Sequence, residues 1–139
     1  MTDCAAKALS LFDAWEARDY DAAMAHLADG AHVRDMPRGL VIDARADIRD
    51  WLASWVVACS DATAGATVPV ASTDGAVVQG VYAGTNDGPF GPLPSTGRSV
   101  SMPFSIVMRF DNRGQVTDYD VYYDQLTLLT QLGHAPALA

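Results

Sequence analysis

The chain has 139 residues, 50% of them apolar or aromatic and 19% charged, which is typical of one globular domain rather than a disordered chain. Nine Lys and Arg against seventeen Asp and Glu give a net charge of −8, a field that repels nucleic acid phosphates and anionic membrane surfaces. We therefore expect a single domain over residues 1–139 without nucleic acid or membrane partners, and a cytoplasmic location, because no basic stretch followed by an apolar one opens the sequence.

The first third of the sequence has the apolar spacing of helices. Apolar residues recur every three to four positions over 3–18, over 20–27 and from about 43 to 59. Residues 30–39 break this pattern with Pro and Gly, and 31–35 alternate as a short strand. We therefore predict three N-terminal helices, interrupted by one strand.

The rest of the sequence is typical of a sheet. It contains predicted strands over 66–72, 75–85, 98–110 and 115–124, a Gly- and Pro-rich loop over 86–97, and a short helix over 125–132. Pro103 indicates an edge strand or a bulge. Helices followed by strands predict an α+β fold, with the helices on one face of a mostly antiparallel, curved sheet. Such a cone has an apolar pocket at its mouth.

The sequence carries no motif for a metal or a phosphate. Cys4 and Cys59 lie far apart with no CxxC, and the three histidines do not cluster. The loop glycines form neither a P-loop nor a GxGxxG motif. We expect no metal, no cofactor and two free thiols.

Three segments resemble a known family. The loop Gly84-Thr85 … Gly88-Pro89-Phe90 … Thr96-Gly97-Arg98 and the terminal Leu128-Leu129-Thr130-Gln131-Leu132-Gly133 are similar to SnoaL-like polyketide cyclases, the ester cyclase branch of the nuclear transport factor 2-like superfamily. Residues 28–37, with the helix around Ile48, also resemble ketosteroid isomerase. The resemblance covers nearly the whole chain and implies a cone-shaped α+β barrel, an apolar cavity and a homodimer or higher oligomer.

The resemblance also implies a chemistry. Such cyclases close a polyketide ring by an intramolecular aldol reaction, without metal or cofactor, using an aspartate as acid and base. The position of that aspartate falls on Val121, and the family's imidazole falls near Ile106. The catalytic base of the isomerase falls on Asp35, which is present, whereas its two oxyanion donors fall on Leu11 and Ile106.

Asp35 is the leading catalytic candidate from the residues themselves. It shares a strand face with Val33, an apolar position expected to point inward. A carboxylate against an apolar wall can serve as a general base or acid near neutral pH. The alternative is a turn residue bonded to Arg34 or Arg38.

The last strand carries further candidates. Alternation separates its residues into two faces: Asp118 and Asp120 on one, and Tyr119, Val121 and Tyr123 on the other. If Val121 faces the cavity, as the resemblance implies, both acids point away and both tyrosines line it. A phenol there can donate to a developing oxyanion, the alternative being aromatic packing. Asp124 is expected to cap the final helix and is the second candidate acid.

We therefore predict a cofactor-free polyketide-cyclase-like enzyme of secondary metabolism, acting by aldol or ester cyclisation on an apolar oxygenated small molecule. The alternatives are an isomerase, a dehydratase or an epoxide-opening enzyme on the same fold, or a non-catalytic small-molecule binding protein. The predicted substrate-binding residues are large and apolar: Trp15, Met36, Trp51, Trp55, Phe90, Met102, Phe104 and Val121. Core packing is the alternative role for each.

Overall fold

The computed structural model describes residues 3–136 and contains one six-stranded sheet of order β2-β1-β6-β5-β4-β3. The strands are β1 (Leu27–Asp35), β2 (Leu40–Ile42), β3 (Thr67–Ala71), β4 (Gly75–Thr85), β5 (Ser99–Phe110) and β6 (Val116–Tyr123). Every neighbouring pair is antiparallel except β1 and β6, which are parallel. The predicted α+β fold with a mostly antiparallel curved sheet is confirmed.

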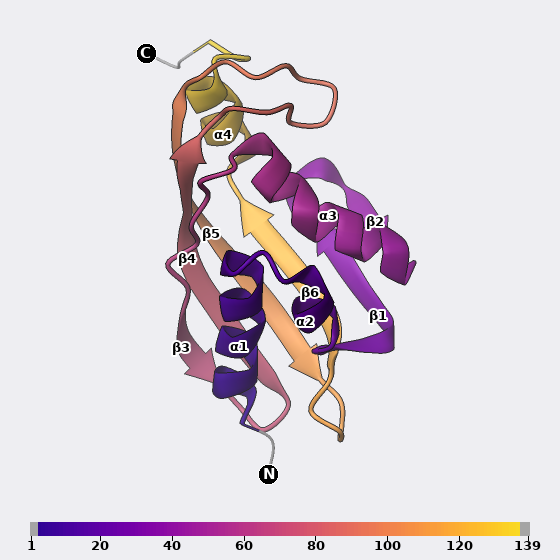
Figure 1. The fold of residues 1–139 in the computed structure, drawn as a ribbon. Helices are drawn as coiled ribbons and strands as arrows, with labels where there is room; N and C mark the ends of the chain where they lie inside the picture. The colour runs from indigo at the N-terminus through magenta and orange to yellow at the C-terminus, as the bar shows by residue number, and fades with distance from the viewer. Residues whose placement is uncertain (1–2, 137–139) are drawn as a thin grey trace.

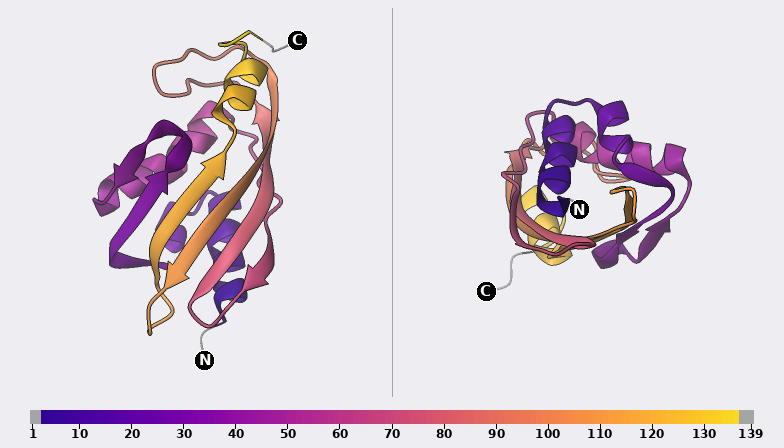
Figure 2. Two further views of the ribbon diagram at one scale, coloured as in Figure 1. Left: turned by 180° about the vertical axis from the view of Figure 1, so that it is seen from behind. Right: turned by 90° about the horizontal axis from the view of Figure 1, so that it is seen from below.

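Three helices, α1 (Cys4–Glu16), α2 (Tyr20–Met24) and α3 (Arg45–Ala58), cover one face of this sheet (Figure 1). The sheet curls around α1, as the view from below in Figure 2 shows, so this covered face is concave. The helix α4 (Gln125–Leu132) lies at the end of the molecule where β6 stops. None of the helices within residues 3–136 is long and apolar enough to cross a membrane.

The second helix is shorter than the sequence predicts. It ends at Met24, and Leu27 begins β1 instead of closing the helix. The reason is tertiary: the N–H of Val116 in β6 donates to the carbonyl of His26 at 2.8 Å, and the Arg45 guanidinium donates to the carbonyls of Met24 and Leu27 at 3.0 Å each. These contacts stabilise the segment after Met24 as part of the sheet instead of as a continuation of the helix.

The core lies between the concave face and the helices. Inward residues of β5 alternate with exposed ones, and the buried ones include Met102, Ile106 and Met108. They pack in the same core cluster as Leu11 of α1 and Ile48 of α3, each about 1% exposed. Full burial of one such side chain contributes about 1.5–3 kcal/mol, so this layer holds the helices on the sheet.

A buried amide ties the loop between β4 and β5 to the end of α3. Asn86 Nδ2 donates to the carbonyls of Ala58 and Gly88, at 2.9 Å each. Its Oδ1 accepts from the Thr96 N–H at 2.7 Å. This clamp folds the loop back over α3, so that Phe90 packs on Trp55, with ring centroids 5.4 Å apart.

Candidate active site

A small apolar cavity lies between the concave sheet face and helices α1 and α3. Six of the predicted substrate-binding residues line it: Trp15, Trp51, Trp55, Met102, Phe104 and Val121. Tyr119 and Tyr123 line it as predicted, and Tyr82 does so without having been predicted. The cavity volume is about 50 Å³, whereas sites for organic ligands usually measure about 300–1,000 Å³. A substrate must therefore displace lining side chains as it enters.

Asp35 ends β1 with its side chain fully buried. Its Oδ2 accepts hydrogen bonds from Arg38 Nε at 2.7 Å and from Trp51 Nε1 at 3.1 Å. Arg38 Nη2 also lies 2.6 Å from Oδ2 as an ion pair, without the alignment of a hydrogen bond. The Tyr123 hydroxyl donates to Oδ1 at 2.8 Å. Three elements, η1 (Met36–Arg38), α3 and β6, thus converge on one carboxylate.

The Asp35 carboxylate is enclosed by one cation and two neutral donors. Burial disfavours its charged form, while the guanidinium and the two neutral donors favour it. Arg38 is itself held in place by aromatic faces, with its Cζ 5.5 Å from the Trp55 ring and 5.3 Å from the Phe90 ring. Burial, and then the hydrogen bond to Asp35, raise the pKa of Tyr123. Tyr123 therefore remains a protonated donor.

Strand register places Asp35 beside the position that the resemblance gives to the family's acid. Asp35 pairs with Val121 across β1 and β6, and Val121 pairs with Ile106 across β6 and β5. All three side chains are buried. They form one row across the sheet, in which the carboxylate stands one strand away from Val121.

The aromatic side chains around the cavity carry six polar groups, and the protein uses four of them. Trp51 and Tyr123 donate to Asp35, Trp15 Nε1 donates to the Leu52 carbonyl at 2.9 Å, and the Tyr82 hydroxyl donates to the Trp55 carbonyl at 2.5 Å.

Two polar groups of the cavity remain within residues 3–136. Trp55 Nε1 is buried without a partner, and the hydroxyl of Tyr119, which lines the cavity, is not part of the hydrogen bonds just described. Leaving a buried donor unpaired costs about 1–3 kcal/mol. Burial raises the pKa of Tyr119, so its hydroxyl keeps its proton.

Four predicted site residues do not line the cavity: Asp35, which lies behind Tyr123 and Trp51, and Met36, Phe90 and Asp124. Met36 belongs to the 3-10 turn after β1, is 41% exposed and does not line the cavity. Phe90 is buried against Trp55 and Arg38 but does not line the cavity. Asp124 caps α4: its carboxylate accepts from the side chain and the N–H of Thr127 at 2.9 and 3.2 Å. These bonds hold the pKa of Asp124 below its ordinary value, and the residue does not line the cavity.

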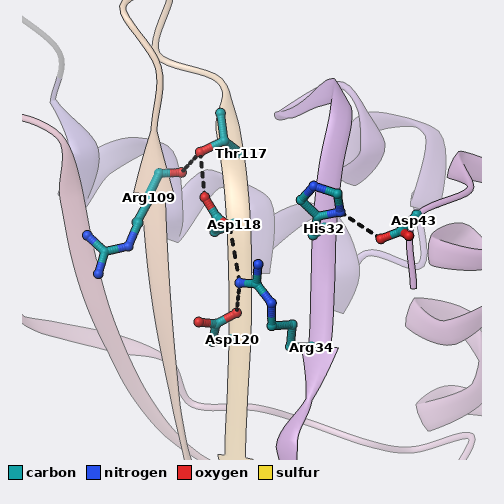
Figure 3. A network of polar contacts seen from close by, with 7 residues as sticks. All are labelled: His32, Arg34, Asp43, Arg109, Thr117, Asp118 and Asp120. Atoms are coloured by element: carbon teal, nitrogen blue, oxygen red, sulfur yellow. Dashed lines mark hydrogen bonds and ion pairs between the residues drawn. The ribbon is translucent and has the colours of Figure 1, made fainter. Parts of the chain in front are cut away.

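The acids of β6 face away from the cavity, which confirms the predicted alternation of this strand. Arg34 of β1 lies between them, with Nη1 3.1 Å from Asp118 Oδ1 and 2.9 Å from Asp120 Oδ1 (Figure 3). This arrangement ties β1 to β6 on the outer sheet face. Neither carboxylate reaches the cavity.

Comparison with protein families gives a match to the SnoaL-like polyketide cyclases over residues 7–132. The chain belongs to this family. Among solved structures, a protein from Jannaschia sp. CCS1 assigned as a SnoaL-like polyketide cyclase has a TM-score of 0.84 at 21% identity, covering 96% of this chain and 93% of that one. AclR from Streptomyces galilaeus, assigned as a hydroxylase, has a TM-score of 0.84 at 20% identity, with coverages of 99% and 85%.

IdmH from Streptomyces antibioticus, assigned as a polyketide cyclase, is similar at 21% identity with a TM-score of 0.79, covering 94% of this chain and 99% of that one. At these identities the structural similarities show the fold. The chain matches no protein of curated function. Membership in the SnoaL-like family therefore gives the class of enzyme, and the chemistry rests on this chain's own residues.

This SnoaL-like chain has features that its sequence did not reveal. The sequence suggested Arg38 only as the partner of a turn aspartate, but in the structure its guanidinium forms the ion pair with the buried Asp35 carboxylate. The indole N–H of Trp51 and the hydroxyl of Tyr82 were not recognised as polar elements of the site. The spacing of Arg38 three residues after Asp35, across Met36-Pro37, was the available signal.

Proposed function

We propose that this protein is a cofactor-free enzyme that closes a ring in an apolar, oxygenated small molecule by intramolecular aldol or ester cyclisation, with Asp35 as the proton shuttle. The observation that carries the proposal is the position of Asp35. Its buried carboxylate pairs in register with Val121, the position of the family's acid by resemblance, and is bonded to Tyr123 at the cavity wall.

The geometry supports a sequence of proton movements. Asp35 does not itself line the cavity: its Oδ2 is occupied by Arg38 and Trp51, and its Oδ1 accepts from the hydroxyl of Tyr123, which does line it, so a substrate that displaces Tyr123 reaches Oδ1. In the proposed reaction Oδ1 takes a proton from a carbon next to a substrate carbonyl, and the electron pair of that C–H bond forms an enolate. The enolate carbon then forms a C–C bond to a second carbonyl, and Asp35 returns its proton to the new alkoxide.

The competing function is a non-catalytic binder of a small apolar molecule. The hydrogen bonding of Asp35 favours this function, because both of its carboxylate oxygens already accept from protein donors. Both functions use the same cavity. They differ in whether a proton leaves the bound molecule.

A probe ketone separates the two functions without the natural substrate. 1-Tetralone is a bicyclic, apolar ketone with exchangeable protons next to its carbonyl, and their replacement by deuterium in D₂O is followed by proton NMR. We expect the protein to accelerate this exchange. Asp35→Asn should lower the catalysed rate by about 10²- to 10⁴-fold, the usual contribution of general base catalysis.

The matched control is Asp120→Asn, an identical change on the outer face of the sheet. It should alter the exchange rate by less than about tenfold, because its side chain points away from the cavity. A protein that binds tetralone without accelerating exchange would be a binder. A larger loss in Asp120→Asn than in Asp35→Asn would exclude Asp35 as the base.

A further inference from the structure

Removal of a proton next to a carbonyl places negative charge on the carbonyl oxygen, and an enzyme gains rate by hydrogen-bonding that oxygen. Tyr123 is poorly placed for this task, because its proton is already directed at Asp35 Oδ1 at 2.8 Å. The positions at which ketosteroid isomerase carries its oxyanion donors by resemblance are Leu11 and Ile106, which have no donor. The oxyanion therefore needs other partners.

We propose that the indole N–H of Trp55 and the hydroxyl of Tyr119 are the two donors that receive this oxygen. The inference rests on the proposed function and names the two groups that would stabilise the enolate oxygen. Both residues line the cavity. Trp55 Nε1 is buried without a hydrogen-bond partner, and within residues 3–136 the Tyr119 hydroxyl takes part in none of the hydrogen bonds that hold the other aromatic polar groups of the cavity. The remaining polar groups of the cavity aromatics are bound to the carboxylate or to backbone carbonyls.

The two donors belong to one aromatic cluster with the proposed base. Trp51 contacts both rings edge-on, at 5.9 Å and 82° to Trp55 and at 5.9 Å and 79° to Tyr119. The N–H of the same Trp51 is hydrogen-bonded to Asp35. Trp51 thus contacts the carboxylate through its N–H and both donor-bearing rings through its own ring, and the Trp55 ring also lies against Tyr123, with centroids 5.4 Å apart, so the proposed base and the two donors belong to one contiguous cluster.

The charge balance of the wall agrees with this assignment. The negative charge of Asp35 is faced by the Arg38 guanidinium, 2.6 Å away, so an oxyanion in the cavity does not meet an uncompensated carboxylate. Both donors are neutral and keep their protons throughout the reaction. They stabilise the developing charge by hydrogen bonding alone, and the transferred proton stays with Asp35 until it returns to the new alkoxide.

The test uses 4-nitrophenol as a probe, because its phenolate is an oxyanion on an aromatic ring with an absorption spectrum distinct from that of the phenol. The pH at which the protein-bound probe ionises reports how strongly the site prefers the oxyanion over the neutral molecule. Trp55→Phe and Tyr119→Phe each remove one donor and keep an aromatic ring. Each should shift that ionisation to higher pH by about one to two units, a 10- to 100-fold loss of preference typical of a hydrogen bond to a charged acceptor.

Trp15→Phe is the matched control, because Trp15 lines the same cavity but its N–H is committed to the Leu52 carbonyl. It should leave the ionisation of the bound probe unchanged, although it alters packing as Trp55→Phe does. Comparing two forms of one bound probe removes any effect of a variant on folding or on overall affinity.

Three outcomes would overturn the assignment: no shift in Trp55→Phe and Tyr119→Phe, an equal shift in Trp15→Phe, or no binding of the probe by the unaltered protein at millimolar concentration. The absence of a shift would mean that aromatic faces, such as that of Tyr82, satisfy the indole N–H. The probe reports no turnover, so this failure is distinct from failure of Asp35 as a base, which the tetralone exchange of the unaltered protein and of Asp35→Asn and Asp120→Asn reports.

Discussion

At the scale of single residues, the site depends on a buried ion pair. Asp35 is inaccessible to solvent and the Arg38 side chain is 23% exposed. Ions removed from water are costly, and their mutual attraction and hydrogen bonds must offset that cost. The Arg38 guanidinium also lies against the rings of Trp55 and Phe90, so this one residue links the charge of the site to its aromatic wall.

The first prediction concerns this pair. Arg38→Gln should lower the free energy of unfolding by about 3–5 kcal/mol, because it leaves the Asp35 carboxylate buried without its cation. Urea unfolding followed by circular dichroism measures the change. The double variant Asp35→Asn/Arg38→Gln should lose less than the single variant, because no charge remains buried. An equal or larger loss in the double variant would show that the guanidinium stabilises the fold mainly by packing.

At the scale of elements, Pro103 and Gly80 show how the sheet accommodates residues that strands usually avoid. Pro103 lies within β5, a central strand, so its predicted place at an edge or a bulge is wrong. It is tolerated because Val81, its partner in β4, directs its N–H to the Ala64 carbonyl and away from β5. The nitrogen of Pro103 therefore points to the β6 side of β5. Strand β6 ends at Tyr123, which pairs with Phe104, so no residue of β6 pairs with Pro103.

The second prediction concerns Gly80 in β4. A Cβ at this position would lie 2.3 Å from the Ala64 carbonyl oxygen and 2.6 Å from Phe104 Cζ. Gly80→Ala should therefore destabilise the protein by about 1–3 kcal/mol, as overpacking usually does. Thermal unfolding measures it. Phe104 lines the cavity, so the variant should also weaken binding of 1-tetralone.

The matched control is Gly30→Ala in β1, where a Cβ would meet no atom within 4 Å. This change should stay within about 0.5 kcal/mol, as surface substitutions do. If both alanine variants unfold at the same temperature, the close approach of β4 to Ala64 and Phe104 does not determine the stability of the protein.

At the scale of the whole molecule, the outer face of the sheet is the surface most suited to a second copy of the chain. Arg34 bridges Asp118 and Asp120 there, which reduces the acidic charge of the strip between β1 and β6 (Figure 3). Val81 and Tyr122, 41% and 45% exposed, border a groove that crosses β4, β5 and β6 on this face. A two-fold symmetric dimer brings the same surface of both copies together, so it would cover these exposed apolar side chains on each copy.

We accordingly predict a homodimer through the outer sheet face. Sedimentation equilibrium at micromolar concentration should give twice the chain mass of 14.8 kDa. Tyr122→Asp should shift the equilibrium to monomer, because it places a charge in an apolar contact. Val57→Asp is the control: it alters an equally exposed residue, on α3 across the sheet, and should leave the mass unchanged. A monomeric mass for the unaltered protein would refute the dimer and leave the fold unaffected.

The local pattern of the sequence determined most of the elements. Helix α4 covers 125–132 as predicted, because its ends are set by neighbours in the chain: Asp124 accepts from Thr127, and Gly133 adopts a φ of +86°. The faces of β6 were also predictable, since alternation depends on the backbone alone. The same alternation placed Asp35 with Val33 on the inward face, where both are buried.

Only the tertiary structure decided what surrounds Asp35. Its donors come from 3, 16 and 88 positions away in the sequence, and a two-residue period identifies the face of a strand but not the side chains that arrive from other elements. The start of β1 at Leu27 and the short strand β2 were equally out of reach, because partners distant in the chain create them. Which donors remain unpaired is likewise a property of the assembled cavity: Trp15 and Trp55 are the same residue type in the same wall, and only the nearby Leu52 carbonyl distinguishes the bonded indole from the free one.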